Sequence, residues 1–236
     1  MRKFILAALA STAMATVAHA GVVDLNFEGI NSTYSSSTTY AFINGFYNGG
    51  TSSDGTSGPN YGVAFSSNAQ AICLNSLTVV CSNTSRGGLA PSSSEGALFF
   101  LSGSSTTIDV AAGFTTGFSF NYTDPNGIVG SVSVYSGLDG TGTLLNSFTL
   151  GATPNGETAC PGYSAAYCPF VPIGVTFAGT AESIVFGGVA NQIVFDDVTF
   201  GSATPGIPEP ATWATMLTGL AAAGAMLRRR RSLAPA

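Results

Sequence analysis

Residues 114–150 read FTTGFSFNYTDPNGIVGSVSVYSGLDGTGTLLNSFTL, and the alternation within this stretch decides the fold. Phe118, Phe120 and Tyr122 alternate with small polar residues, and the same spacing returns at Val132 and Val134. A period of two residues is typical of β-strands with one buried face. The glycine-rich cluster 136–142 then predicts a turn, so we expect residues 144–150 to return as the hairpin partner.

The same pattern extends outward to both ends of the chain. Further strands are expected near residues 23–27, 171–177, 184–186 and 193–200, and helical periodicity is nearly absent between them. Short strands separated by Gly, Asn and Ser turns favour a sandwich of two sheets. The sequence therefore predicts an all-β fold, a single antiparallel, jelly-roll-like β-sandwich spanning residues 21–203.

Residues 31–62 have a different composition, rich in Ser, Thr, Gly and Asn. Their aromatic residues are Tyr34, Tyr40, Phe42, Phe46, Tyr47 and Tyr61. One interpretation is a long surface loop that contains part of a strand. The other is a platform on which flat aromatic faces stack against sugar rings.

The charge balance excludes several kinds of chemistry. Residues 21–205 contain eleven acidic residues and one basic residue, Arg86, so their net charge is 1 − 11 = −10. Such a domain repels phosphate and is not expected to bind nucleic acid. It contains no Lys, and His19 lies before it, so Ser-His-Asp, Cys-His and Ser-Lys catalysis lack their base. Carboxylate-pair glycoside hydrolysis remains as an alternative, but no pattern marks such a pair, and we expect a protein that is not an enzyme.

Four cysteines fall into two pairs with seven residues between the members of each pair. The pairs are Cys73/Cys81 and Cys160/Cys168. Zinc sites favour two to four intervening residues, and an exported chain meets an oxidising compartment. Of the three possible connectivities, we expect the two local disulfides.

The first twenty residues have the three parts of a secretory signal peptide. Met1-Arg2-Lys3 is basic, residues 4–18 are apolar, and Ala18-His19-Ala20 is a small-x-small cleavage site. We therefore expect residues 1–20 to be removed by signal peptidase, so that the mature chain begins at Gly21.

Residues 204–236 carry a second targeting pattern. Pro208-Glu209-Pro210 precedes an uncharged stretch, residues 211–227, which four arginines, Arg228, Arg229, Arg230 and Arg231, follow. Seventeen residues form a helix of about 25 Å, the lower limit for crossing a bilayer. Positive charge is retained on the cytoplasmic side, so the sequence predicts an inner-membrane helix with all preceding residues outside.

These three features in this order resemble the PEP-CTERM sorting signal of Gram-negative bacteria. The resemblance implies processing by an exosortase and delivery to the cell surface or extracellular matrix, in association with exopolysaccharide. An ordinary tail anchor is the alternative. We therefore expect an exported structural or adhesive component, with a lectin that recognises the exopolysaccharide as the alternative function.

The two ends of the expected β-domain carry neighbouring acids. Strict alternation places Asp196 on the same face as Val194, Val198 and Phe200, where a carboxylate requires a partner such as a hard cation. The opening Phe27-Glu28-Gly29 and the closing Asp196-Asp197-Val198 are similar to those of several jelly-roll carbohydrate-binding modules. That resemblance implies a structural Ca²⁺ held by Glu28 and by Asp196 or Asp197. The alternative is a pair of solvated acids at a sheet edge.

Overall fold

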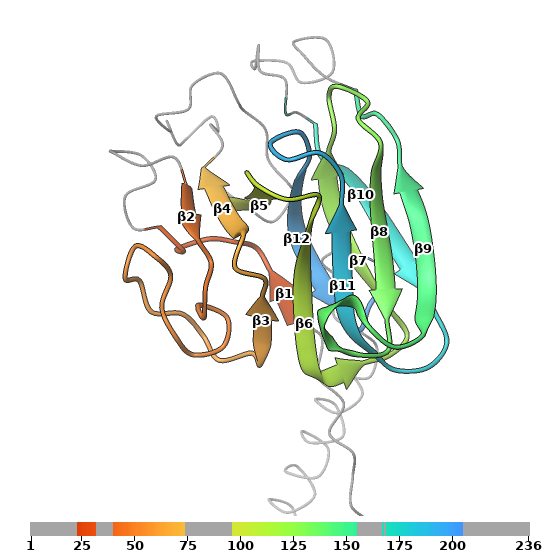
Figure 1. Cartoon of the computed structure of the whole chain (residues 1–236), viewed down its shortest axis with the longest axis horizontal. Coiled ribbons are helices and arrows are strands. Elements are labelled where there is room, and N and C mark those ends of the chain that lie inside the picture. The colour runs from red at the N-terminus through yellow and green to blue at the C-terminus, as the bar shows by residue number, and fades with distance from the viewer. Residues whose placement is uncertain (1–22, 32–39, 74–95, 155–166, 168, 205–236) are drawn as a thin grey trace, which may run out of the picture.

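Two antiparallel β-sheets face each other in the computed structural model of the chain (Figure 1). The structure describes residues 23–31, 40–73, 96–154, 167 and 169–204. Its regular elements are twelve strands and one short 3-10 helix, Leu138–Gly140. The predicted all-β sandwich is confirmed.

The larger sheet has seven strands. Its order is β10 (Val171–Thr176), β7 (Gly117–Thr123), β12 (Val194–Phe200), β5 (Gly96–Phe100), β4 (Ala69–Cys73) and β2 (Tyr40–Phe42), and β1 (Val23–Leu25) also pairs with β12. The first and last described strands are therefore neighbours. Both β1 and β5 pair with β12, at different positions along it, through Val198–Phe200 and through Phe195.

The smaller sheet has five strands. Its order is β3 (Val63–Phe65), β6 (Ser105–Phe114), β11 (Ala181–Gly187), β8 (Gly130–Tyr135) and β9 (Leu144–Leu150). The predicted hairpin is confirmed, because β8 and β9 pair antiparallel with Val132 opposite Phe148. The turn between them contains the 3-10 helix.

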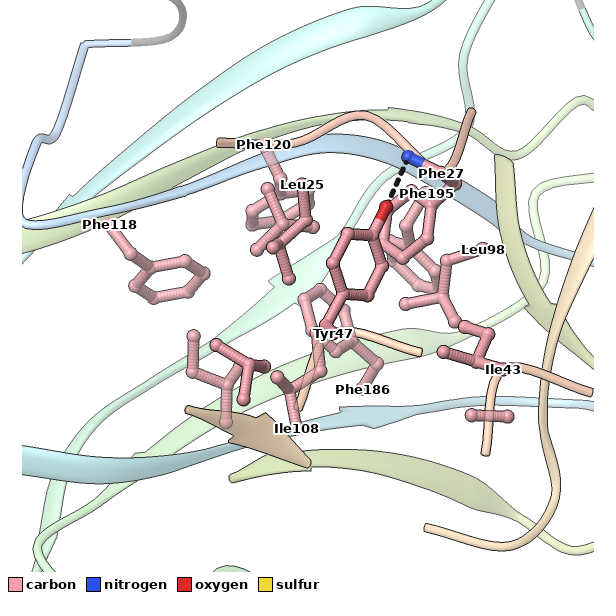
Figure 2. Close-up of a cluster of buried hydrophobic side chains, with 14 of the residues drawn as sticks. Leu25, Phe27, Ile43, Tyr47, Leu98, Ile108, Phe118, Phe120, Phe186 and Phe195 are labelled. Atoms are coloured by element: carbon pink, nitrogen blue, oxygen red, sulfur yellow. Dashed lines mark hydrogen bonds between the residues drawn. The ribbon is translucent and has the colours of Figure 1, made fainter. Parts of the chain in front are cut away.

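The space between the sheets is filled with aromatic and branched side chains, several of which Figure 2 labels. Phe120 makes ring contacts with Phe186 at 5.4 Å and with Phe195 at 5.9 Å, so all three residues join in one aromatic cluster across the two sheets. Burying a phenylalanine fully contributes about 2–3 kcal/mol. These rings explain why the alternation of residues 118–122 is so regular.

A second apolar cluster covers the outer face of the larger sheet. Its members are Ile72, Ala97, Phe99, Tyr167, Phe170 and Val194. Tyr167 and Phe170 precede β10 in sequence and pack over β4, β5 and β12. Consequently β5 is buried along its whole length, and its sequence Gly-Ala-Leu-Phe-Phe lacks alternation.

The interpretation of residues 31–62 as a loop that contains part of a strand is confirmed over residues 40–62, whereas stacking against sugar rings stays a prediction. Residues 40–62 contain β2 and a long loop closed by the bridges Asn48–Asn60 and Thr51–Ser57. Phe46 and Tyr47 are buried in the core, whereas Tyr40, Phe42 and Tyr61 are exposed. Tyr34 lies outside the described residues.

Both targeting segments lie outside the described residues, so the signal peptide, Ala18, Ala20, Gly21, residues 211–227 and the arginine cluster stay predictions. Among the residues that the structure describes, no helix is long and apolar enough to span a membrane.

Candidate functional site

The junction between β1, β5 and β12 gathers the acids at the two ends of the domain. Asp24 lies opposite Thr199, and its carboxylate accepts a hydrogen bond of 3.2 Å from the Thr199 hydroxyl. Asp196 and Asp197 lie on β12, and Glu28 follows β1. The pairing of β1 with β12 therefore brings together carboxylates that are separated by about 170 residues in the sequence.

A β-bulge in β12 sets the direction of these side chains. Asp196 lies opposite Asn121, but Thr199 lies opposite Ser119, so β12 has one residue more than β7 over this interval. Asp197 occupies the bulge with φ 48°, a left-handed conformation that Asp tolerates better than most residues.

The prediction that Asp196 shares a face with Val194, Val198 and Phe200 is right for Val194 and wrong for Val198 and Phe200. Phe195, Val198 and Phe200 point into the core, whereas Val194 belongs to the outer cluster. The extra residue in the bulge reverses the alternation, so Asp196 lies on the outer face with Val194. Asp196 and Asp197 are nevertheless only 2% and 1% exposed.

Hydrogen bonds join these acids to three strands. The Asn121 amide donates to Asp197 Oδ2 at 3.0 Å, and the Asp197 backbone N–H donates to Asp196 Oδ1 at 2.8 Å. Glu28 Oε1 accepts a bond of 2.9 Å from the Gly96 N–H. A glycine is required at position 96, because a Cβ there would lie 2.1 Å from the Phe27 carbonyl oxygen.

Tyr47 approaches the same junction from the core. Its hydroxyl accepts a hydrogen bond of 2.9 Å from the Phe27 backbone N–H, as Figure 2 shows. Burial raises the pKa of Tyr47, the Phe27 N–H opposes the rise, and the charges of Asp196, Glu28 and Asp24 add to it. Burial also raises the pKa of Asp24, the charge of Asp197 adds to it, and the Thr199 hydroxyl opposes it. The carboxylates are therefore close enough to influence one another.

Two polar side-chain atoms beside this junction are not engaged in hydrogen bonds. Asn121 Oδ1 and Ser119 Oγ are buried without a hydrogen-bond partner on the outer face of β7. Carboxylate and amide oxygens suit a hard cation such as Ca²⁺. In the part of the chain that the structure describes, no three His, Cys, Asp or Glu side chains are grouped to hold a metal ion. A cation here would therefore depend on backbone and amide oxygens beside one or two carboxylates.

The sequence did not indicate four members of this junction, which are Asp24, Asn121, Thr199 and Tyr47. Alternation could have placed Asn121 on the outer face, between the core residues Phe120 and Tyr122. Its nearness to Asp197 depends on the pairing of β7 with β12, which a single sequence does not reveal.

The aromatic residues of β2 form a second candidate site, at the edge of the larger sheet. Tyr40 and Phe42 are 42% and 38% exposed, although both are large and apolar. Ala41 between them points into the core, so the two rings share the outer face of the strand. The Tyr40 ring meets Phe99 of β5 edge-on at 6.0 Å, which joins the exposed pair to the outer apolar cluster.

The remaining predicted site residues are mostly outside the described residues. Cys73 ends β4 and takes part in a disulfide bond. The other three cysteines, Cys81, Cys160 and Cys168, lie outside the described residues, and the partner of Cys73 is one of them. The two local pairings therefore stay predictions. The predicted sorting residues also lie outside the described part of the chain: Pro208, Glu209, Pro210 and Arg228 to Arg231.

Solved family 6 carbohydrate-binding modules resemble this chain. One, studied by dissection of its binding sub-sites, is 19% identical with a TM-score of 0.32, over 59% of this chain and 86% of the module. Another, CsCBM6-3 from Clostridium stercorarium in complex with cellobiose, is 18% identical with a TM-score of 0.32, over 58% of this chain and 83% of the module. No protein-family model and no curated protein matches the chain.

Proposed function

We propose that the chain is an exported, non-enzymatic protein that binds polysaccharide at the cell surface or in the extracellular matrix. The observation that carries the proposal is the exposed pair of rings on β2, Tyr40 and Phe42. Two large apolar rings on one face of an edge strand form a flat surface of the kind that sugar rings stack against. Adhesion to an exopolysaccharide through this face joins the structural role to the carbohydrate-binding role.

The backbone of β2 and the Tyr40 ring are held in place by their neighbours. The Phe42 backbone N–H donates to the Ser53 hydroxyl at 2.8 Å, and the Phe42 carbonyl accepts from the Ser53 N–H at 2.9 Å. Tyr40 rests against Phe99. Little conformational entropy would therefore be lost when a ligand binds this surface, which favours binding.

The test is binding of the purified exported protein to a panel of soluble polysaccharides by affinity electrophoresis. A Tyr40→Ala, Phe42→Ala double variant should lose binding by tenfold or more, since stacking on one ring is worth about 1 kcal/mol. Tyr61→Ala is the matched control, because Tyr61 is also exposed but stacks on Tyr47 in the loop. Equal binding by the wild type and the double variant would exclude this surface.

We also propose the structural Ca²⁺ at the β1–β12 junction, held by Glu28 and by Asp196 or Asp197. The contact of the Asn121 amide with Asp197, together with the unpartnered amide oxygen of Asn121, supports it. When bound, the ion would tie the first strand to the last and neutralise part of the negative charge there.

We propose finally that signal peptidase acts on the chain first, that the chain is exported through the inner membrane, and that an exosortase then sorts it. This sorting is supported by the order of residues 208–231 in the sequence.

A further inference from the structure

Five of the described strands lie at an edge of the sandwich. They are β10, β2 and β1 in the larger sheet, and β3 and β9 in the smaller. An edge strand presents unpaired N–H and C=O groups, to which another chain can pair unless the strand is very short or contains proline or charged side chains. Four of the five are protected in this way, because β1, β2 and β3 have three residues each and Pro172 lies within β10. The strand β9 is long and lacks this protection.

The sequence of β9, LLNSFTL, is suited to pairing with another strand. It contains no charged residue, no Pro and no Gly. Leu144 is 51% exposed, and Ser147 and Thr149 are exposed as well. A register shift leaves Leu145 as a bulge opposite β8, so the regular part of β9 runs from Asn146 to Leu150. In the part of the chain that the structure describes, β8 is the only strand that pairs with β9. The other edge of β9 is therefore open to a further strand.

The charged residues of the domain avoid this edge. Residues 21–205 carry a net charge of −10, yet residues 125–138, 140–156 and 158–181 contain no charged residue. These stretches include β8, β9 and β10. The Asn146 amide donates to the Thr176 carbonyl at 2.9 Å, so the edges formed by β9 and β10 lie side by side (Figure 1). Two copies of this acidic domain repel each other least when they meet through this uncharged side.

The strand β9 is also complementary to a second copy of itself. In an antiparallel pair with Ser147 on a two-fold axis, Ser147 lies opposite its own copy and Asn146 lies opposite Phe148. Both Asn146 and Phe148 are on the core face of β9, because they lie opposite the core residues Val134 and Val132 of β8. Residues on the core face therefore meet residues on the core face, and neither like charges nor prolines are brought together.

We propose that β9 is a dimerisation strand, and that two copies of the protein pair antiparallel through it with Ser147 at the two-fold axis. The two smaller sheets then join into one continuous sheet, and the two-fold symmetry closes the assembly at a dimer. Since β2 and β10 lie at opposite edges of the larger sheet, the dimer carries its two β2 strands at its two ends. The inference goes beyond the proposed function and does not depend on carbohydrate binding.

The experiment measures the oligomeric state of the purified exported protein by sedimentation velocity, over a wide concentration range and at low and high salt. Ser147→Lys places two ammonium groups opposite each other at the proposed axis. Ala64→Lys is the matched control, because Ala64 is exposed on β3 at the opposite edge of the same sheet and the change in net charge is identical. The melting temperature of each variant at low concentration shows whether the monomer is folded.

We expect the wild type to dimerise reversibly, and to do so more tightly at high salt, because salt screens the repulsion between two acidic copies. Ser147→Lys should weaken dimerisation about tenfold or more, since like charges directly opposite each other destabilise a strand pair. Ala64→Lys should dimerise at least as tightly as the wild type.

A second pair of variants tests the register and does not depend on a lysine being tolerated. Directly opposite residues of an antiparallel pair have Cβ atoms about 4.5–5.5 Å apart, close to the spacing of a disulfide. With oxidised glutathione as the oxidant, Ser147→Cys should therefore form a covalent dimer much faster than Ala64→Cys, as judged by non-reducing electrophoresis.

Several outcomes would overturn the proposal. A wild type that stays monomeric up to its solubility limit would exclude the dimer. Protection of the β9 amides from hydrogen exchange in that monomer would show that a segment of the same chain covers the edge. A dimer that Ser147→Lys and Ala64→Lys weaken equally would use another surface. Crosslinking of Ser147→Cys no faster than Ala64→Cys would exclude the pairing at Ser147.

Discussion

Two aspartates meet where the β8–β9 turn folds back over the smaller sheet. The Asp139 backbone N–H donates to the Asp109 carboxylate at 2.8 Å, and Asp139 holds this position with φ 54°. Ser183 supports the turn by donating to the Gly137 carbonyl and accepting from the Gly140 N–H. The turn is therefore fastened to β6 and β11, at the cost of bringing two negative charges together.

Burial raises the pKa of Asp109, the Asp139 N–H opposes the rise, and the Asp139 charge adds to it. The folded state thus binds this proton more tightly than the unfolded state, so the free energy of unfolding falls as the pH rises above about 3.8. Asp109→Asn keeps an acceptor for the N–H and removes the charge. We expect it to be more stable than the wild type at pH 7 by roughly 0.5 kcal/mol, the size of a solvent-screened charge pair.

Urea unfolding between pH 3.5 and 7.5 checks this prediction. The stability difference between variant and wild type should shrink as the pH falls toward 4. Glu182→Gln removes a carboxylate from β11 outside this pair and controls for net charge. A pH dependence that Asp109→Asn and Glu182→Gln change equally would contradict the local origin.

Among the elements, those with one face on the core and one polar face could be predicted from the sequence. The alternation at residues 118–122 and 132–134 and the glycine-rich turn located β7, β8 and β9, because each has a polar and an apolar side. Residues 171–177, 184–186 and 193–200 located β10, β11 and β12 in the same way.

The missed elements lack that signal. In β5 both faces are buried, and β2 and β3 have three residues each, too few for a period. The long strand β6 is the exception, because Thr106, Ile108 and Val110 do alternate with more exposed residues, and the strand was missed nevertheless. In the candidate sites, the acids at the two ends of the domain were identified, but the bulge at Asp197 was not. Its effect is conformational, since one extra residue reverses the side chains that follow it, Val198 and Phe200, relative to Asp196.

The junction of β1 with β12 yields the second prediction. An ion that binds only the folded state raises the unfolding free energy by about 2.7 kcal/mol at one hundred times its dissociation constant. For a domain of this size the melting temperature should rise by roughly 5–10 °C on adding Ca²⁺ after treatment with chelator.

Asp197→Asn is the informative variant, because Asn also tolerates the positive φ of this position. It should abolish the calcium-dependent rise, whereas Asp54→Asn in the exposed loop should retain it. Identical melting curves in calcium and in chelator would show that the junction is held together by hydrogen bonds alone.

At the scale of the whole molecule, the sequence places the β-domain between two segments that we predict to direct its export. If an exosortase processes the chain near Pro208-Glu209-Pro210, the surface form should lack Arg228 to Arg231. Intact-mass spectrometry of the protein from the cell surface checks this. Changing Pro208-Glu209-Pro210 to alanines should leave the full-length form in the inner membrane. Arginines retained in the surface form of cells with an active exosortase would instead support the tail anchor.

The pairing of the first and last strands also decides how the domain would carry a mechanical load. Val23 lies opposite Phe200, so the chain enters and leaves the sandwich at the same end. Tension between a polymer on β2 and an attachment after Phe200 would pass through β4 and β5 into β12, which is an interior strand paired on both edges. On this path β5 pairs with β12 at one position only, Phe195 opposite Leu98, whereas β1 pairs with β12 at three positions. The topology therefore makes the β5–β12 pairing the weak link along the path from a ligand on β2 to an attachment after Phe200.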